Sequence, residues 1–171
     1  MSRVFRLVGL ADWDNGDLEV MVVDVGDDRS DPSWSPDGDR IVFWTARPAW
    51  NGYRDIGVMN ADGTDVHQLT DDDDIGGSQM PSWSPDGKRI AFTSNRDHRG
   101  WEIYVMNADG TDAHQLTDDD DYEFYPSWSP DGDRIVFENT RDGDSEIFVM
   151  NADGTNTYST GQQGSCPSFG G

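Results

Sequence analysis

The sequence predicts an all-β protein built from repeated, four-stranded antiparallel sheets, and three observations support this. The motif "PSWSPDG" occurs three times, beginning at Pro32, Pro81 and Pro126, in units of roughly 45 residues. A Gly or Pro turn signal follows about every ten residues, as in chains of short strands. No segment shows the apolar spacing of an amphipathic helix.

Each unit divides into four short strands joined by tight turns. In "SPDG", Pro has the φ angle that the second position of a turn needs, and Gly accepts the positive φ needed at the end of the turn. The turn "NADG" follows the same logic before the last strand. In the second unit the expected strands are Pro81–Ser84, Arg89–Phe92, Ile103–Asn107 and Asp112–Thr117, and in the third unit the last strand is Thr155–Thr160.

The third strand of each unit indicates how the sheets pack. "IYVMN" at Ile103–Asn107 is apolar from Ile to Met. A strand with one solvent-exposed face would instead alternate apolar and polar residues. Both faces of the sheet must therefore be covered, and neighbouring sheets are the available cover. A ring of such sheets is a β-propeller, and a row would be a solenoid.

The second unit carries a family resemblance. The segment Pro81–Thr117, "PSWSPDGKRIAFTSNRDHRGWEIYVMNADGTDAHQLT", resembles the repeat of TolB-type, WD-like β-propellers, and the similarity extends over nearly the whole chain. Such propellers usually have six or more blades, sometimes beside a catalytic domain. The resemblance implies a periplasmic or extracellular location and, as in TolB, a scaffold role with a lipoprotein partner.

The two ends of the chain resemble pieces of one further blade. Arg3–Val25 resembles a second and third strand, and Cys166–Gly171 resembles the start of a first strand. Pairing them would complete about four blades per chain and remove exposed sheet edges. We therefore expect a single domain over 1–171, with a partial blade 1–31 completed by 165–171 and blades at 32–80, 81–125 and 126–164.

The sequence allows two ways of closing the ring. One chain could close on itself as four blades, or two chains could exchange their last strands and form one eight-bladed ring. We favour the homodimer because four blades require steep wedging between sheets.

The amino-acid composition limits the kinds of partner that the protein is expected to bind. The formal net charge is −22, which repels phosphate backbones and so argues against nucleic acid. It favours cations or basic partner surfaces, although solubility or life in high salt explains it equally. The chain has one Cys and no apolar run long enough to span a membrane. Its first residues do not form a signal peptide, so the sequence itself leaves the compartment open.

Two acidic runs link the fourth strand of one unit to the next unit and are candidate cation ligands. Ca²⁺ prefers six to eight oxygen ligands in flexible geometry. The alternative is a solvated acidic loop without a metal. The candidate Ca²⁺ ligands are Asp71, Asp72, Asp73, Asp74, Asp118, Asp119, Asp120 and Asp121.

The loops between second and third strands lie on the same rim and differ most between copies. Variable loops on a rigid scaffold often carry specificity, so Arg54, Arg96, Trp101 and Arg141 are candidate partner-binding residues. The alternative is that these loops differ between copies without serving any function. By contrast, the repeated Trp34, Trp83 and Trp128 are expected to pack between blades.

The sequence thus predicts a non-enzymatic binding or scaffold module for a protein, peptide or cation, with no catalytic residues. One alternative is a fragment of a propeller enzyme, oligopeptidase-like or lyase-like, without its catalytic part. Another is a recently amplified or engineered repeat array whose main property is self-assembly.

Overall fold

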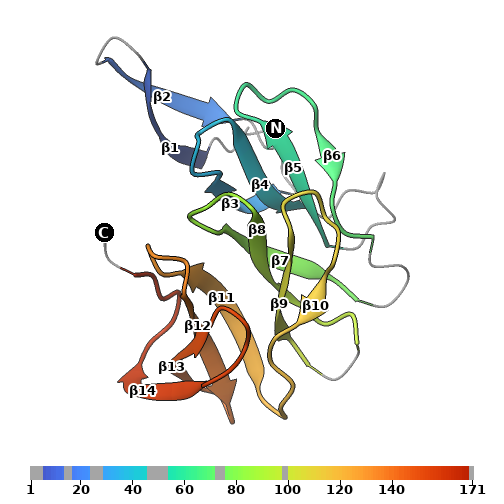
Figure 1. Cartoon of the computed structure of the whole chain (residues 1–171), viewed down its shortest axis with the longest axis vertical. Helices are drawn as coiled ribbons and strands as arrows, with labels where there is room; N and C mark the ends of the chain where they lie inside the picture. The colour runs from blue at the N-terminus through green and yellow to red at the C-terminus, as the bar shows by residue number, and fades with distance from the viewer. Residues whose placement is uncertain are drawn as a thin grey trace.

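Every regular element of the described chain is a β-strand, which confirms the all-β prediction (Figure 1). Most strands belong to three four-stranded antiparallel sheets that follow one another around an arc. The computed structural model describes residues 6–13, 17–23, 29–45, 54–71, 76–97 and 100–169.

Each sheet is one repeat unit and has its strands in chain order, as a propeller blade requires. The first blade contains β3 Arg29–Trp34, β4 Arg40–Thr45, β5 Asp55–Asn60 and β6 His67–Gln68. The second contains β7 Ser78–Trp83, β8 Arg89–Ser94, β9 Glu102–Asn107 and β10 His114–Gln115. The third contains β11 Tyr122–Trp128, β12 Arg134–Arg141, β13 Asp144–Asn151 and β14 Tyr158–Gln163.

The strand bounds differ from expectation at both edges of a blade. The innermost strands β3, β7 and β11 begin before the proline of the motif. The outermost strands β6 and β10 are only two residues long. In the third blade β14 begins later than expected, at Tyr158. The first of these differences lengthens the strands that line the inside of the arc.

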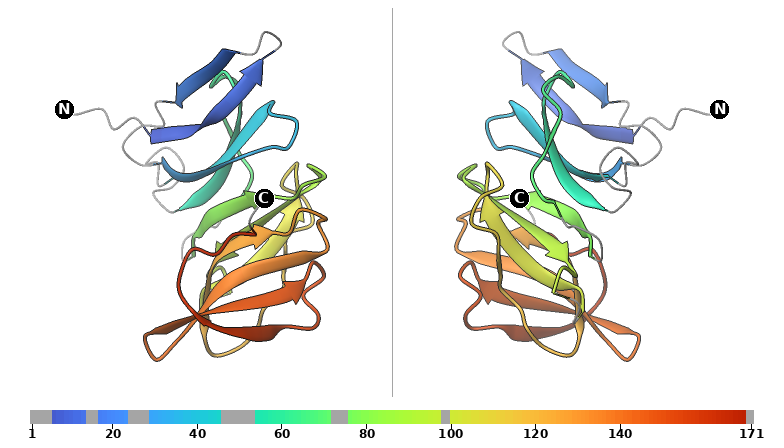
Figure 2. Two further views of the ribbon diagram at one scale, coloured as in Figure 1. Left: turned by 90° about the vertical axis from the view of Figure 1, so that its left-hand side faces the viewer. Right: turned by 90° about the vertical axis from the view of Figure 1, so that its right-hand side faces the viewer.

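An antiparallel pair, β1 Arg6–Trp13 and β2 Asp17–Val23, stands at the N-terminal end of the arc beside β3 (Figure 2). Within the described residues β1 is hydrogen-bonded to β2 and to no other strand. Ring closure through β1 therefore remains a prediction.

The core lies between the blades. Trp83 of the second blade packs with Val42 and Ile56 of the first in one cluster. Trp128 of the third blade packs with Ile103 and Val105 of the second in another. Inter-blade packing by these two tryptophans is thus confirmed, and it explains why β9 is apolar on both of its faces.

An arginine from the preceding blade covers each of these two tryptophans. The Arg40 guanidinium lies 4.7 Å from the centre of the Trp83 ring, and that of Arg89 lies 4.6 Å from the Trp128 ring. Such contacts contribute about 0.5–2 kcal/mol, depending on desolvation. The Trp128 Nε1–H also donates to the Ser82 carbonyl at 3.1 Å.

A backbone hydrogen bond also joins each pair of neighbouring blades. Ser78 N–H donates to the Arg54 carbonyl at 2.6 Å, and Glu123 N–H donates to the Trp101 carbonyl at 2.7 Å. Both connect the first strand of one blade to the residue before the third strand of the preceding blade. The contact therefore recurs at equivalent positions and sets the spacing of the blades.

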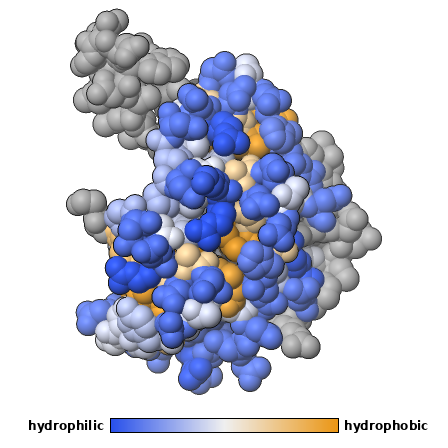
Figure 3. Space-filling view, viewed as in Figure 1, coloured by the Kyte–Doolittle hydropathy of each residue, from blue (hydrophilic) through white to orange (hydrophobic). Residues whose placement is uncertain are grey.

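Hydrophilic residues cover most of the face shown in Figure 3, as expected for a chain of charge −22. No helix in the described part of the chain is long and apolar enough to span a membrane.

Candidate functional site

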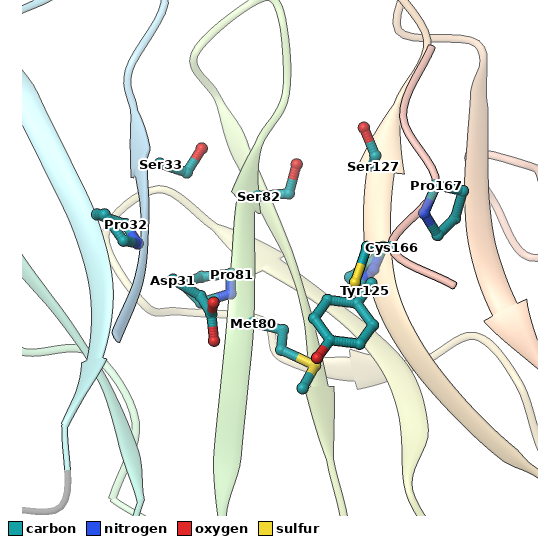
Figure 4. A pocket seen from close by; sticks show the side chains of 11 residues that line it. Asp31, Pro32, Ser33, Met80, Pro81, Ser82, Tyr125, Ser127, Cys166 and Pro167 are labelled. Atoms are coloured by element: carbon teal, nitrogen blue, oxygen red, sulfur yellow. The ribbon is translucent and has the colours of Figure 1, made fainter. Parts of the chain in front are cut away.

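The inside of the arc contains a cavity of about 300 Å³, to which each repeat contributes equivalent residues (Figure 4). Its wall combines a proline and a serine from each innermost strand with one residue that differs between repeats. The lining residues are Asp31, Pro32, Ser33, Met80, Pro81, Ser82, Tyr125, Pro126, Ser127, Cys166 and Pro167.

The variable residue is held in an unusual backbone conformation in each repeat. Asp31, Met80, Tyr125 and Cys166 have φ angles of 48°, 55°, 54° and 52°. In the three blades this residue lies where the register of the innermost strand shifts. Non-glycine residues rarely adopt positive φ, and bulges of this kind often redirect a side chain. The repeated kink therefore displays one different side chain per blade at the cavity.

The four displayed side chains differ in chemistry. The Asp31 carboxylate accepts a hydrogen bond from Trp44 Nε1 at 2.7 Å. Figure 4 shows the Met80 thioether and the Tyr125 ring next to one another, with Cys166 close to the ring. Burial raises the pKa of the Tyr125 hydroxyl above its ordinary value, and the Cys166 thiol adds to the shift. Tyr125 therefore stays a neutral hydrogen-bonding group at physiological pH.

The sequence analysis missed this cavity, although the sequence contains a signal for it. Each variable residue directly precedes the proline of a repeated motif, so it differs between copies beside constant neighbours. Asp31 is of a type enriched at positive φ, but Met80, Tyr125 and Cys166 are not, so residue type does not mark this position.

Two predicted rim residues contact the neighbouring blade. Arg54 Nη1 donates to Gln79 Oε1 of the next blade at 2.9 Å, and its guanidinium lies 5.2 Å from the Trp44 ring. The Trp101 ring packs beside Phe124 of the next blade, with 6.2 Å between ring centres. Both residues thus join blades, and partner binding by them remains a prediction.

The other two candidate rim residues, Arg96 and Arg141, contact different kinds of group. Arg96 lies 5.1 Å from the Tyr104 ring and donates through Nη2 to Ser78 Oγ at 3.2 Å. Arg141 is largely exposed and donates through Nε and Nη2 to the Asp121 carboxylate, at 2.5–2.9 Å. The Arg141–Asp121 ion pair places that acidic run and this loop on one rim, as expected.

The acidic runs divide into parts with different surroundings. Asp121 is buried, and its ion pair with Arg141 lowers the pKa of its carboxyl. Asp71 and Asp118, Asp119 and Asp120 are exposed, while Asp72, Asp73 and Asp74 lie outside the described residues. Among the described residues no three His, Cys, Asp or Glu side chains gather as a metal site. Calcium binding therefore remains a prediction from the sequence.

The second and third blades match a known family. A family model described as the TolB beta propeller domain matches residues 76–169, more than half of the chain. The chain belongs to the TolB beta propeller domain family. The recognition made from the repeat motif is therefore confirmed.

Solved structures of this family and of other propellers are similar to the chain. A TolB-type protein from Agrobacterium tumefaciens is 30% identical, with a TM-score of 0.66 over 74% of this chain and 47% of that one. TolB from Acinetobacter baumannii is 24% identical, with a TM-score of 0.66 over 85% of this chain and 35% of that one. The β-propeller domain of the trilobed protease from Pyrococcus furiosus is 18% identical, with a TM-score of 0.58 over 77% and 42%.

The chain spans less than half of each of these three proteins. The last two similarities show the propeller fold alone. No curated protein sequence matches the chain.

Proposed function

We propose that the chain is a non-enzymatic binding module whose inner cavity receives a protein or peptide segment. The observation that carries this proposal is the repeated kink, which places a different side chain at the same cavity in each blade. Positive φ also recurs outside the cavity, at Asp65, Asp112 and Asn156, so the proposal depends on the convergence of the inner kinks on one cavity. Strain at equivalent places around a concave surface is typical of a binding site.

The chemistry of the cavity favours a cationic peptide segment. Asp31 supplies a negative charge, the serines and Tyr125 supply hydroxyl groups, and Met80 supplies a polarizable apolar contact. The net charge of −22 attracts basic partners over a long range and raises their rate of encounter.

A charge-graded peptide array, scored by fluorescence anisotropy, tests this function. We expect basic peptides to bind, and Met80→Ala combined with Tyr125→Ala to weaken binding at least tenfold. His114→Ala is the control, because His114 is exposed on the outermost strand β10. Equal binding by the double variant and the control would contradict the proposal.

We further propose that a second copy of the chain completes the ring. Gly164 N–H donates to the Ser145 carbonyl at 3.1 Å, at the position where Ser78 and Glu123 make the inter-blade bond. Cys166 has the same positive φ as the kink residues of the three blades. These two features support residues 164–169 as the first strand of a further blade.

The exposed side of the third blade supports the same proposal. Ile56 and Ile103 are fully buried by the following blade, whereas the equivalent Ile147 is partly exposed. A further blade would cover it, and β1 and β2 of a second copy offer two strands that lack a first strand. Strand exchange in both directions gives a twofold-symmetric ring of eight blades, with a four-bladed monomer as the alternative.

A further inference from the structure

Three aromatic side chains gather on the rim where the second and third blades meet. The rings of Trp101 and Phe124 lie 6.2 Å apart, and both residues are partly exposed. Tyr122 is 49% exposed, and its ring lies against the backbone of Gly100, where an added Cβ would be 3.5 Å from Tyr122 Cδ1. We call Trp101, Tyr122 and Phe124 the rim platform. Exposed apolar side chains that lie together often mark an interaction site.

The preceding blade interface is built differently at the three equivalent positions, which are occupied by Arg54, Gln79 and Gly77. There, the Arg54 guanidinium lies 5.2 Å from the centre of the Trp44 ring, so the chain itself places a cation over an aromatic ring. Among the described residues, no Arg or Lys covers a ring of the rim platform. The platform therefore offers aromatic rings to a cation that the described chain does not supply.

Negative charge stands beside the rim platform. The aspartates at 118–120 are exposed and precede Tyr122 by two to four residues. The Arg141 guanidinium on the same rim is already paired with the buried Asp121. Aromatic faces attract cations, and nearby carboxylates strengthen that attraction. This combination favours the guanidinium or ammonium group of a basic side chain over a neutral or anionic ligand.

The strand β11 connects the rim platform to the inner cavity. Tyr122 begins the strand, and Tyr125, three residues later, is the kink residue that lines the cavity. A strand rises about 3.3 Å per residue, so the Cα atoms of the two tyrosines are at most about 10 Å apart. An extended peptide has the same rise. Two of its side chains that are two or three residues apart can therefore reach both places.

We propose that the rim platform binds one of two basic side chains of an extended peptide, while the other enters the inner cavity. This inference rests on the proposed cavity function and adds the spacing of the ligand, with two cations two or three residues apart. Once the first side chain is bound, the second contact is intramolecular, which raises the affinity without any change in the protein. The ligand is therefore selected by the spacing of its charges as well as by their number.

Peptides of equal composition that carry two arginines at different spacings test this inference. Fluorescence anisotropy is measured in EDTA, which keeps divalent cations from the carboxylates at 118–120. We expect arginines two or three residues apart to bind about two- to fivefold more tightly than arginines seven residues apart, as one cation–aromatic contact contributes.

Tyrosine variants assign the spacing preference to the platform. Tyr122→Ala should abolish the preference, and Tyr122→Phe should keep it, because the aromatic ring remains. Tyr158→Ala is the matched control, since Tyr158 is 51% exposed but lies on the outermost strand β14. A parent chain without a spacing preference, or a preference that survives Tyr122→Ala, would overturn the inference.

Nuclear magnetic resonance of the full chain with isotope-labelled tyrosine rings separates this inference from the proposed function. Shifts of both Tyr122 and Tyr125 on addition of the diarginine peptide, with Tyr158 unchanged, support contact at both places. A shift of Tyr125 alone overturns the role of the rim platform and leaves the cavity function standing. A shift of Tyr122 alone contradicts the cavity function and the two-point ligand, and a shift of neither contradicts both proposals.

Discussion

The guanidinium of Arg134 lies over the ring of Phe169, 5.6 Å from its centre. Arg40 and Arg89 cover Trp83 and Trp128 in the same way at the two blade interfaces. Phe169 therefore takes the place of the repeated tryptophan, next to the open side of the third blade. The contact shows that the end of the described chain already has the geometry of an inter-blade contact.

The tryptophan contact itself should be a main source of stability. We expect Trp128→Ala to lower the free energy of unfolding by about 3–5 kcal/mol, because it leaves a cavity between two blades. Trp128→Phe should lose less, since it keeps an aromatic ring and removes only the hydrogen bond to Ser82 and part of the stacking on Arg89. Urea unfolding followed by circular dichroism measures both, and equal losses would contradict this assignment.

A matched pair of glycines tests how closely the blades approach. Gly63 and Gly110 occupy equivalent "NADG" turns, with φ of 82° and 84°. A Cβ at Gly63 would meet nothing within 4 Å, whereas a Cβ at Gly110 would lie 2.8 Å from the Leu69 carbonyl oxygen. Gly63→Ala should therefore lose only about 1 kcal/mol from backbone strain, and Gly110→Ala clearly more. Similar melting temperatures for both variants would show that the blades can separate at this turn.

Acid stability should depend on the aspartate of the "SPDG" turns. A hydrogen bond from the Ser84 hydroxyl, and then one from the Lys88 N–H, lower the pKa of Asp86 below its ordinary 3.8. The ionised turn therefore stabilises the fold above about pH 3.8 and loses this contribution as pH falls through the lower, folded pKa. Asp86→Asn should be less stable than the parent chain at pH 7, and the gap should shrink toward pH 2. A constant gap over that range would argue against the assigned cause.

The sequence alone predicted the repeated four-stranded sheets because turn residues and apolar third strands act locally. It also predicted that Trp83 and Trp128 pack between blades, since a large apolar residue once per repeat has few other uses. The kinks at Met80 and Tyr125 were not predicted, because their backbone conformation depends on tertiary packing and not on residue type.

The buried glutamates escaped prediction for a different reason. Glutamate at a strand end is ordinarily exposed, so nothing in the local pattern indicates that Glu102 and Glu123 lie beneath a neighbouring blade. The pairing of Arg141 with Asp121 could likewise be seen only once the rim was assembled.

The molar mass in solution tests completion of the ring most directly. Light scattering after size exclusion should give about twice the chain mass of 19.1 kDa. Deleting Ser165–Gly171, which removes Phe169, should return the protein to a less stable single chain. A parent protein that is already a single chain of 19.1 kDa, with the same melting temperature after the deletion, would contradict strand exchange.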